Sequence, residues 1–159
     1  MLSLSQTTGY AIRALACLSK AHCARQTTSQ IARCSGVPRP YLAKIITTLA
    51  RHGLLLARRG VRGGNVLARP PGATTLLEVV EAVEGPDWLG PCLLGLDECR
   101  DRTACPTHAF WQRAREEIRA ELAHTTLADY LRCQHTRLAE AGGHSHRRKD
   151  RPRPAALTT

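Results

Sequence analysis

The apolar positions near the start of the chain follow a helical period. Between residues 7 and 22 they recur at i, i+3, i+4 and i+7, occupied by Ala11, Ala14, Leu15 and Leu18. This spacing places all four side chains on one face of a helix. The pattern therefore predicts an amphipathic helix that packs this face against a core.

The next stretch predicts two helices joined by a tight turn. Thr27 and Gln30 have the spacing of a capping box at the start of a short helix, TSQIARC. Gly36 breaks that helix, and Pro40 suits the first turn of a third helix that runs to His52. The buried stripe expected on the third helix is Leu42, Ile45, Ile46 and Leu49. A short helix, a turn containing glycine and a second helix are typical of a helix-turn-helix.

After Gly53 the pattern changes from a helix to a hairpin. The segments LLLARR and NVLAR read as two short strands, and the glycine-rich GVRGG reads as the turn between them. A hairpin directly after a helix-turn-helix is a wing. Three arginines crowd its tip, namely Arg58, Arg59 and Arg62.

The second half of the chain is predicted to be helical. Thr75 and Glu78 form another capping box, which opens the helix LLEVVEAVEG. A long amphipathic stretch over 107–124 carries Trp111, Ala114, Ile118 and Leu122 on one stripe, and a short helix, TLADYLR, follows. We therefore expect a mainly α chain: a winged helix-turn-helix over 1–72, a cysteine loop and dimerisation helix over 73–133, and a disordered basic tail over 134–159.

Charge is divided unevenly along the chain. The net charge is +10, and residues 1–77 contain eleven lysines and arginines but no aspartate or glutamate. Residues 78–141 carry a net charge of −5, and the tail carries +4. The positive charges of residues 1–77 would repel one another unless an anion neutralises them. Nucleic acid is the partner that these charges favour.

Double-stranded DNA is thus the expected partner of the first half. In a helix-turn-helix the second helix enters the major groove, and a basic wing suits a narrow minor groove. The residues expected to contact DNA are Arg39, Tyr41, Lys44, Thr48, Arg51, Arg58, Arg59 and Arg62. No apolar run is long enough for a membrane span, and the start MLSLSQTTGYAIRAL lacks the features of a secretory signal, so a cytoplasmic location is expected.

The segment CLLGLDECRDRTACPTH holds four side chains that bind metals, Cys92, Cys99, Cys105 and His108. Zinc sites usually bring ligands in closer pairs than this loop does. Thiolate and imidazole also suit the iron of a larger iron–sulfur cluster, so both kinds of site remain open at this point.

No function is predicted for the four other cysteines. The chain has seven cysteines and no export signal, which argues against a framework of disulfides because the cytosol keeps thiols reduced. Cys17 lies beside the apolar stripe of the first helix and is expected in the core. No nearby partner and no role are predicted for Cys23, Cys34 or Cys133.

Several of these segments together resemble the Rrf2 family of winged-helix regulators, and in particular its IscR-like branch. The resemblance covers about residues 1–131 and includes GYAIRAL, PRPYLAKIITTLARHGLL, RGVRGG and CPTHAFW. It implies a homodimer built on the long helix around Trp111 to Leu122, with an iron–sulfur cluster in each subunit. It also implies that the state of the cluster controls DNA affinity.

Carried over to this chain, the resemblance assigns Cys92, Cys99 and Cys105 as cluster ligands and His108 as the fourth ligand of a 2Fe-2S cluster, favoured over 4Fe-4S. The spacing departs from the IscR-like branch, because six residues separate Cys92 from Cys99 instead of five and the glycines of that branch are missing. The nitric-oxide-sensing branch takes an acidic ligand from the N-terminal helix, whereas this chain has no acid before Glu78. A ligand from the partner subunit is a third option.

The function expected is that of a transcriptional repressor whose operator affinity follows the state of an iron–sulfur cluster. The alternative keeps the DNA-binding half and makes the cysteines a thiol switch or a zinc site. An enzyme or electron carrier is disfavoured, because the chain has neither a phosphate-binding loop nor a dinucleotide fingerprint.

Overall fold

The computed structural model describes residues 4–19, 25–58, 60, 63–95, 105–134 and 136. The elements in order are α1 (Gln6–Leu18), α2 (Thr28–Ser35), α3 (Arg39–Arg51), β1 (Leu55–Arg58), β2 (Gly64–Leu67), the 3-10 turn η1 (Pro71–Ala73), α4 (Leu76–Glu84) and α5 (His108–His124). Residues 127–134 form a further helical segment. The mainly helical winged fold expected from the sequence is confirmed.

The helix-turn-helix forms where the capping and turn residues predict it. Thr27 and Gln30 make both hydrogen bonds of the capping box at the start of α2. Gly36 ends α2 with φ of +67°, a left-handed conformation that glycine adopts at little cost. Pro40 lies in the first turn of α3, where a missing N–H group is harmless. These local signals fix where α2 stops and α3 begins.

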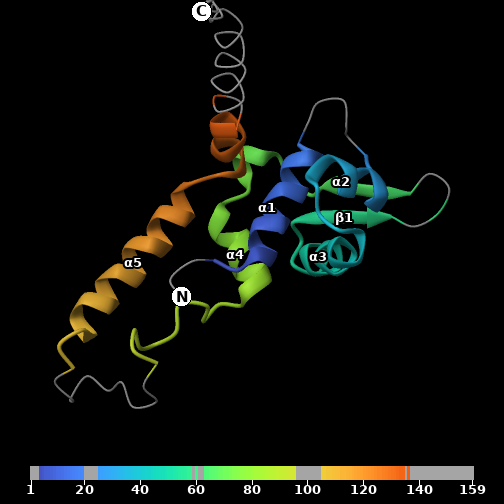
Figure 1. Ribbon diagram of the computed structural model, residues 1–159. Coiled ribbons are helices and arrows are strands. Elements are labelled where there is room, and N and C mark those ends of the chain that lie inside the picture. The colour runs from blue at the N-terminus through green and yellow to red at the C-terminus, as the bar shows by residue number, and fades with distance from the viewer. Residues whose placement is uncertain are drawn as a thin grey trace, which may run out of the picture.

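In the described part of the chain, α1, α2, α3 and α4 pack together (Figure 1) and share a hydrophobic core. The stripe predicted on α3 is buried in it, together with the apolar faces of α1 and α4. Its members include Ala11, Leu15, Ile31, Leu42, Ile45, Ile46, Leu49, Leu55, Val79 and Leu127. Because Leu127 comes from the segment after α5, the C-terminal part of the described chain packs on the half that holds the helix-turn-helix.

The wing is an antiparallel hairpin whose second strand is bonded to the segment just before α2. Leu55 pairs with Leu67 and Arg58 with Gly64. Gln26, which lies outside the hairpin, forms a β-bridge with Asn65 of β2 through backbone hydrogen bonds of 3.0 and 2.7 Å. Gln26, just before α2, is therefore bonded to β2 and helps to position the wing.

The second half begins with the predicted capping box of Thr75 and Glu78, whose two hydrogen bonds are both formed. α5 projects away from the core, with its N-terminal end outermost and its C-terminal end nearest α4 (Figure 1), and Trp111 is the one residue of this helix that is buried. The chain returns through a bridge between Thr75 and Thr126, which attaches the helical segment after α5 to the start of α4. The short helix predicted from TLADYLR is thus confirmed.

Two expectations about the first helices are corrected. α1 ends at Leu18 and not at residue 22, since Ser19 forms its C-cap with N–H bonds to the Leu15 and Ala16 carbonyls. Cys34, expected to lack a nearby partner, is bonded to Cys17 in a disulfide. Packing of α1 on α2 brings these two residues together, although 17 positions separate them in the sequence.

Some predicted features lie outside the described residues. These are Arg59 and Arg62 of the wing, Cys23, Cys99 and nearly all of the tail from residue 134. In the described part of the chain, no helix has both the length and the apolar surface that a bilayer span requires.

Candidate nucleic-acid interface and cysteine segment

The residues predicted to contact DNA on α3 remain accessible to solvent beside the buried stripe of that helix. Arg39, Lys44 and Arg51 are exposed, Tyr41 is 63% exposed, and Thr48 is half-buried. Burial of Leu42 and its stripe holds the helix so that these five side chains stay outside. On the wing, Arg58 at the end of β1 is also exposed. The basic and polar side chains needed to reach a groove or a phosphate are therefore available on both elements.

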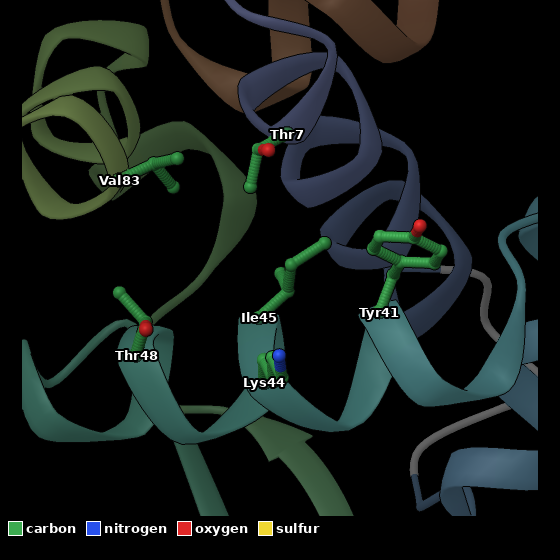
Figure 2. Close-up of a pocket in the computed structure, with 6 residues that line it drawn as sticks. All are labelled: Thr7, Tyr41, Lys44, Ile45, Thr48 and Val83. Carbon is green, nitrogen blue, oxygen red and sulfur yellow. The ribbon is translucent and has the colours of Figure 1, made fainter.

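A cleft of about 160 Å³ lies beside this face, between α1, α3 and α4 (Figure 2). Figure 2 shows Tyr41, Ile45 and Thr48 rising from α3 toward Thr7 of α1 and Val83 of α4. The sequence gives no signal for this cleft, because its walls come from three segments far apart in the chain. It places the end of α4 next to the helix expected to read DNA.

Glu84, the last residue of α4, bonds to the start of α1. Its carboxylate accepts a hydrogen bond from the Ser5 backbone N–H at 3.0 Å and a short one from the Thr8 hydroxyl. Partial burial raises the pKa of Glu84, but the bonds from Ser5 and Thr8 outweigh it, so this pKa lies below its usual value. Glu84 is therefore a charged link between α4 and α1.

The chain beyond Glu84 is held against α5. Arg119 of α5 donates to the Pro86 carbonyl at 3.0 Å and pairs with Glu81 of α4. The indole N–H of Trp111 donates to the Gly90 carbonyl at 3.1 Å. The residue before Gly90, Leu89, is buried. Residues 86–90 are thus attached to α5 at two points just before Cys92.

The surroundings of Cys105 lower the pKa of its thiol. Its sulfur lies 3.2 Å from the Thr107 hydroxyl, and hydrogen bonds from the side chain and backbone of Thr107 lower its pKa. Slight burial and the nearby charge of Cys92 oppose this shift, while the backbone N–H of His108 reinforces it. Cys105 also precedes the first turn of α5, where the helix dipole favours an anion.

The structure brings together part of the predicted ligand set. Cys92 is close enough to Cys105 for their charges to interact, and the His108 backbone N–H lies 3.1 Å from the Cys105 carbonyl. Neither Cys92 nor Cys105 is in a disulfide. Cys99 lies outside the described residues, and among those described no three cysteine, histidine or acidic side chains form a group that could hold a metal ion.

Comparison with known proteins gives a consistent result. A family model described as "Rrf2: Iron-dependent Transcriptional regulator" matches residues 4–132. The regulator IscR of Xenorhabdus nematophila is 29% identical over 106 residues, which are 67% of this chain and 64% of that protein.

Two solved structures share the fold. CymR, the global cysteine regulator of B. subtilis, has a TM-score of 0.67 and 26% identity, and the match covers 82% of this chain and 97% of CymR. IscR of T. potens has a TM-score of 0.65 and 25% identity, with 84% of this chain and 88% of that chain covered.

Proposed function

Because the chain belongs to the Rrf2 family of DNA-binding transcriptional regulators, we propose that an iron–sulfur cluster bound by residues 92–108 controls its affinity for operator DNA. The observation that carries this proposal is the position of Cys105 just before α5, with its sulfur 3.2 Å from the Thr107 hydroxyl and Cys92 near enough to interact with it electrostatically. The family includes IscR as well as the cysteine regulator CymR, so the chemistry of this segment decides between related functions.

The residues present fit such a cluster. Thiolates are the ligands that cluster iron prefers, and the hydrogen bonds from Thr107 lower the pKa of Cys105 and so ease its deprotonation. Cys92, Cys99 and Cys105 are the proposed thiolate ligands, and His108 is the proposed fourth ligand. When bound, the cluster would supply a group sensitive to oxidation and to iron supply.

We further propose that two copies of the chain associate through α5. Ala114, Ile118 and Leu122 form the predicted apolar stripe of this helix, and all three remain half-exposed. Phe110 in the first turn is 57% exposed, and Leu94 in the cysteine segment has the same exposure. Apolar surface arranged along a protruding helix supports a dimer, because burial of that surface stabilises association. Two recognition helices would then meet two half-sites of an operator.

The contacts around α4 supply a route between the cysteine segment and the DNA-binding half. Trp111 of α5 is hydrogen-bonded to Gly90, and Arg119 of α5 is hydrogen-bonded to Pro86. A change in residues 91–107 that moves α5 therefore also displaces the residues that follow α4. Glu84 passes that displacement to α1 through Ser5 and Thr8. The cleft beside α3 has Thr7 and Val83 in its walls, so the orientation of α3 responds to the same displacement.

The test uses protein purified without oxygen, with iron, acid-labile sulfide and zinc assayed on one sample. Duplexes selected from a random library then serve as probes for cluster-loaded and cluster-free protein. We expect visible absorption bands with matched iron and sulfide, lost in Cys99→Ala, and at least a tenfold difference in duplex affinity between the two forms. Equal affinities for every selected duplex would refute control by a cluster.

A second candidate, a thiol switch, is favoured by the same lowered pKa of Cys105, because thiolates are the form that oxidants attack. Colourless protein whose duplex affinity changes with peroxide and recovers with thiol would support this candidate. Stoichiometric zinc without such a response would instead support a structural zinc site.

A further inference from the structure

Cys17 and Cys34 form a cysteine pair inside the DNA-binding half, separate from the cysteine segment. Cys17 lies in the last turn of α1 and is 4% exposed, whereas Cys34 lies in the last turn of α2 and is exposed. Their Cα atoms are 6.1 Å apart and their sulfur atoms are bonded. This separation lies within the range of native disulfides, so the helix packing itself holds the two residues at bonding distance.

The surroundings of the pair admit a small reactant. A cleft of about 90 Å³ opens beside the sulfur atoms, lined by Arg13, Ala16, Cys17, Cys34, Ser35 and Gln134. Arg13, whose guanidinium lies 4.9 Å from the centre of the Tyr10 ring, is the one charged residue among the described residues that line this cleft. In the reduced protein a reactant reaches the exposed Cys34 first, and the buried Cys17 is placed to react second.

We propose that Cys17 and Cys34 are a reversible oxidation site that staples α1 to α2 under oxidising conditions. With hydrogen peroxide, the Cys34 thiolate attacks one oxygen, the O–O bond breaks, and a sulfenic acid forms as hydroxide leaves and becomes water. Cys17 then attacks the Cys34 sulfur, the S–O bond breaks, and a second water leaves. The two thiols lose two electrons and two protons in total, and a thiol reductant restores them.

The site suits a compartment in which thiols are normally reduced. Disulfides found there are mostly transient and belong to catalytic or redox-sensing cysteines. The oxidised form retains the buried stripe of α3 and the left-handed turn at Gly36, so the staple and an intact helix-turn-helix are compatible. We expect oxidation to stabilise the DNA-binding half and to leave duplex affinity within about threefold, because the disulfide lies outside the set of residues predicted to contact DNA.

The expected stabilisation is large enough to measure. Crosslinking of residues 17 positions apart restricts the unfolded chain, and for a protein of this size the melting temperature should rise by roughly 6–12 °C on oxidation. This effect is independent of the proposed cluster. The experiment therefore uses the full chain in which Cys92, Cys99 and Cys105 are replaced by serine, alongside the wild type.

Peptide mapping identifies the bond directly. Cleavage after lysine and arginine places Cys17 in ALACLSK, Cys23 in AHCAR and Cys34 in CSGVPRPYLAK. Reduced protein is treated with peroxide, alkylated and digested. We expect ALACLSK and CSGVPRPYLAK to be joined, and to separate after thiol treatment. Alkylated Cys17 and Cys34, or a join to AHCAR in their place, would overturn the proposal.

Two variants complete the test. Cys34→Ser is expected to abolish the rise in melting temperature on oxidation while leaving the reduced protein folded, since Cys34 is exposed. Cys133→Ser, a change at another exposed cysteine, is the matched control and should retain the rise. An equal rise in Cys34→Ser, or none in the wild type, would show that the pair is no staple.

Discussion

The attachment of the wing depends on glycine at position 64, and Gly64→Ala should break it. Gly64 has φ of +145°, and a Cβ atom built there lies 2.8 Å from Arg25 Cγ and 3.1 Å from the Gln26 carbonyl oxygen. The Arg25 side chain is able to move aside. The Gln26 backbone moves only by disturbing its bridge to Asn65.

The cost of this substitution has two parts. Alanine with positive φ costs about 1–3 kcal/mol in backbone strain at any such position. At Gly64 the overlap also threatens three hydrogen bonds between Gln26 and Asn65, two of the backbone and one from the Asn65 amide at 3.1 Å. With about 1 kcal/mol for each bond, their loss adds up to about 3 kcal/mol.

Gly60 offers a matched control, because it has φ of +104° and, among the described residues, no atom lies within 4 Å of an added Cβ. Gly60→Ala introduces the backbone strain of a positive φ without a steric overlap of the new Cβ atom. Urea denaturation followed by circular dichroism should show Gly64→Ala less stable than Gly60→Ala by about 2 kcal/mol or more. Gly64→Ala should also lower duplex affinity more, since its wing is displaced. Equal losses of stability in the two variants would refute the reasoning from steric overlap.

Three further predictions concern charge, association and DNA contact. Glu84→Gln should cost about 1–2 kcal/mol of stability at pH 7. Because the pKa of Glu84 is lowered in the folded state, the stability difference between wild type and variant should be complete above the unfolded pKa near 4.5. It should vanish as pH falls through the folded pKa. A stability difference independent of pH would count against the link between α4 and α1. Ile118→Asp should convert a dimer to a monomer in sedimentation while Glu117→Gln does not, and unchanged sedimentation of both variants would exclude this stripe as the interface. Lys44→Ala should reduce the slope of log affinity against log salt by about 0.9, and an unchanged slope would show that Lys44 contacts no phosphate.

The parts of the fold that local chemistry determines could be predicted from the sequence. The capping boxes at Thr27 and Thr75 mark where α2 and α4 begin, because a side chain three residues along completes each of them. Gly36 and Gly53 mark where helices end, because their positive φ values suit glycine. These signals act within a few residues, so the sequence carries them in full.

The parts that depend on distant segments could not be predicted. Cys17 and Cys34 meet because α1 packs on α2, and neither cysteine has a partner at a recognisable spacing. The cleft beside α3 combines Thr7 with Val83, which no periodic pattern relates. In the candidate cluster site, residue type identified Cys92 and Cys105, but the lowered pKa of Cys105 required the position of Thr107 at the start of α5.

The separation of charge along the chain gives Glu84 a role that its position alone does not explain. The first turn of α1 contains no acidic residue, so the positive end of that helix lacks the anion that would ordinarily stabilise it. Glu84 supplies this anion from the other half of the chain, and it also accepts the Ser5 N–H. The first half of the chain can thus stay positively charged, and so attract DNA, along its length. Its first helix nevertheless depends on the carboxylate of Glu84, which lies only eight residues before Cys92. Displacement of Glu84 would remove that anion from α1, which is why a change in the cysteine segment should be felt in the DNA-binding half.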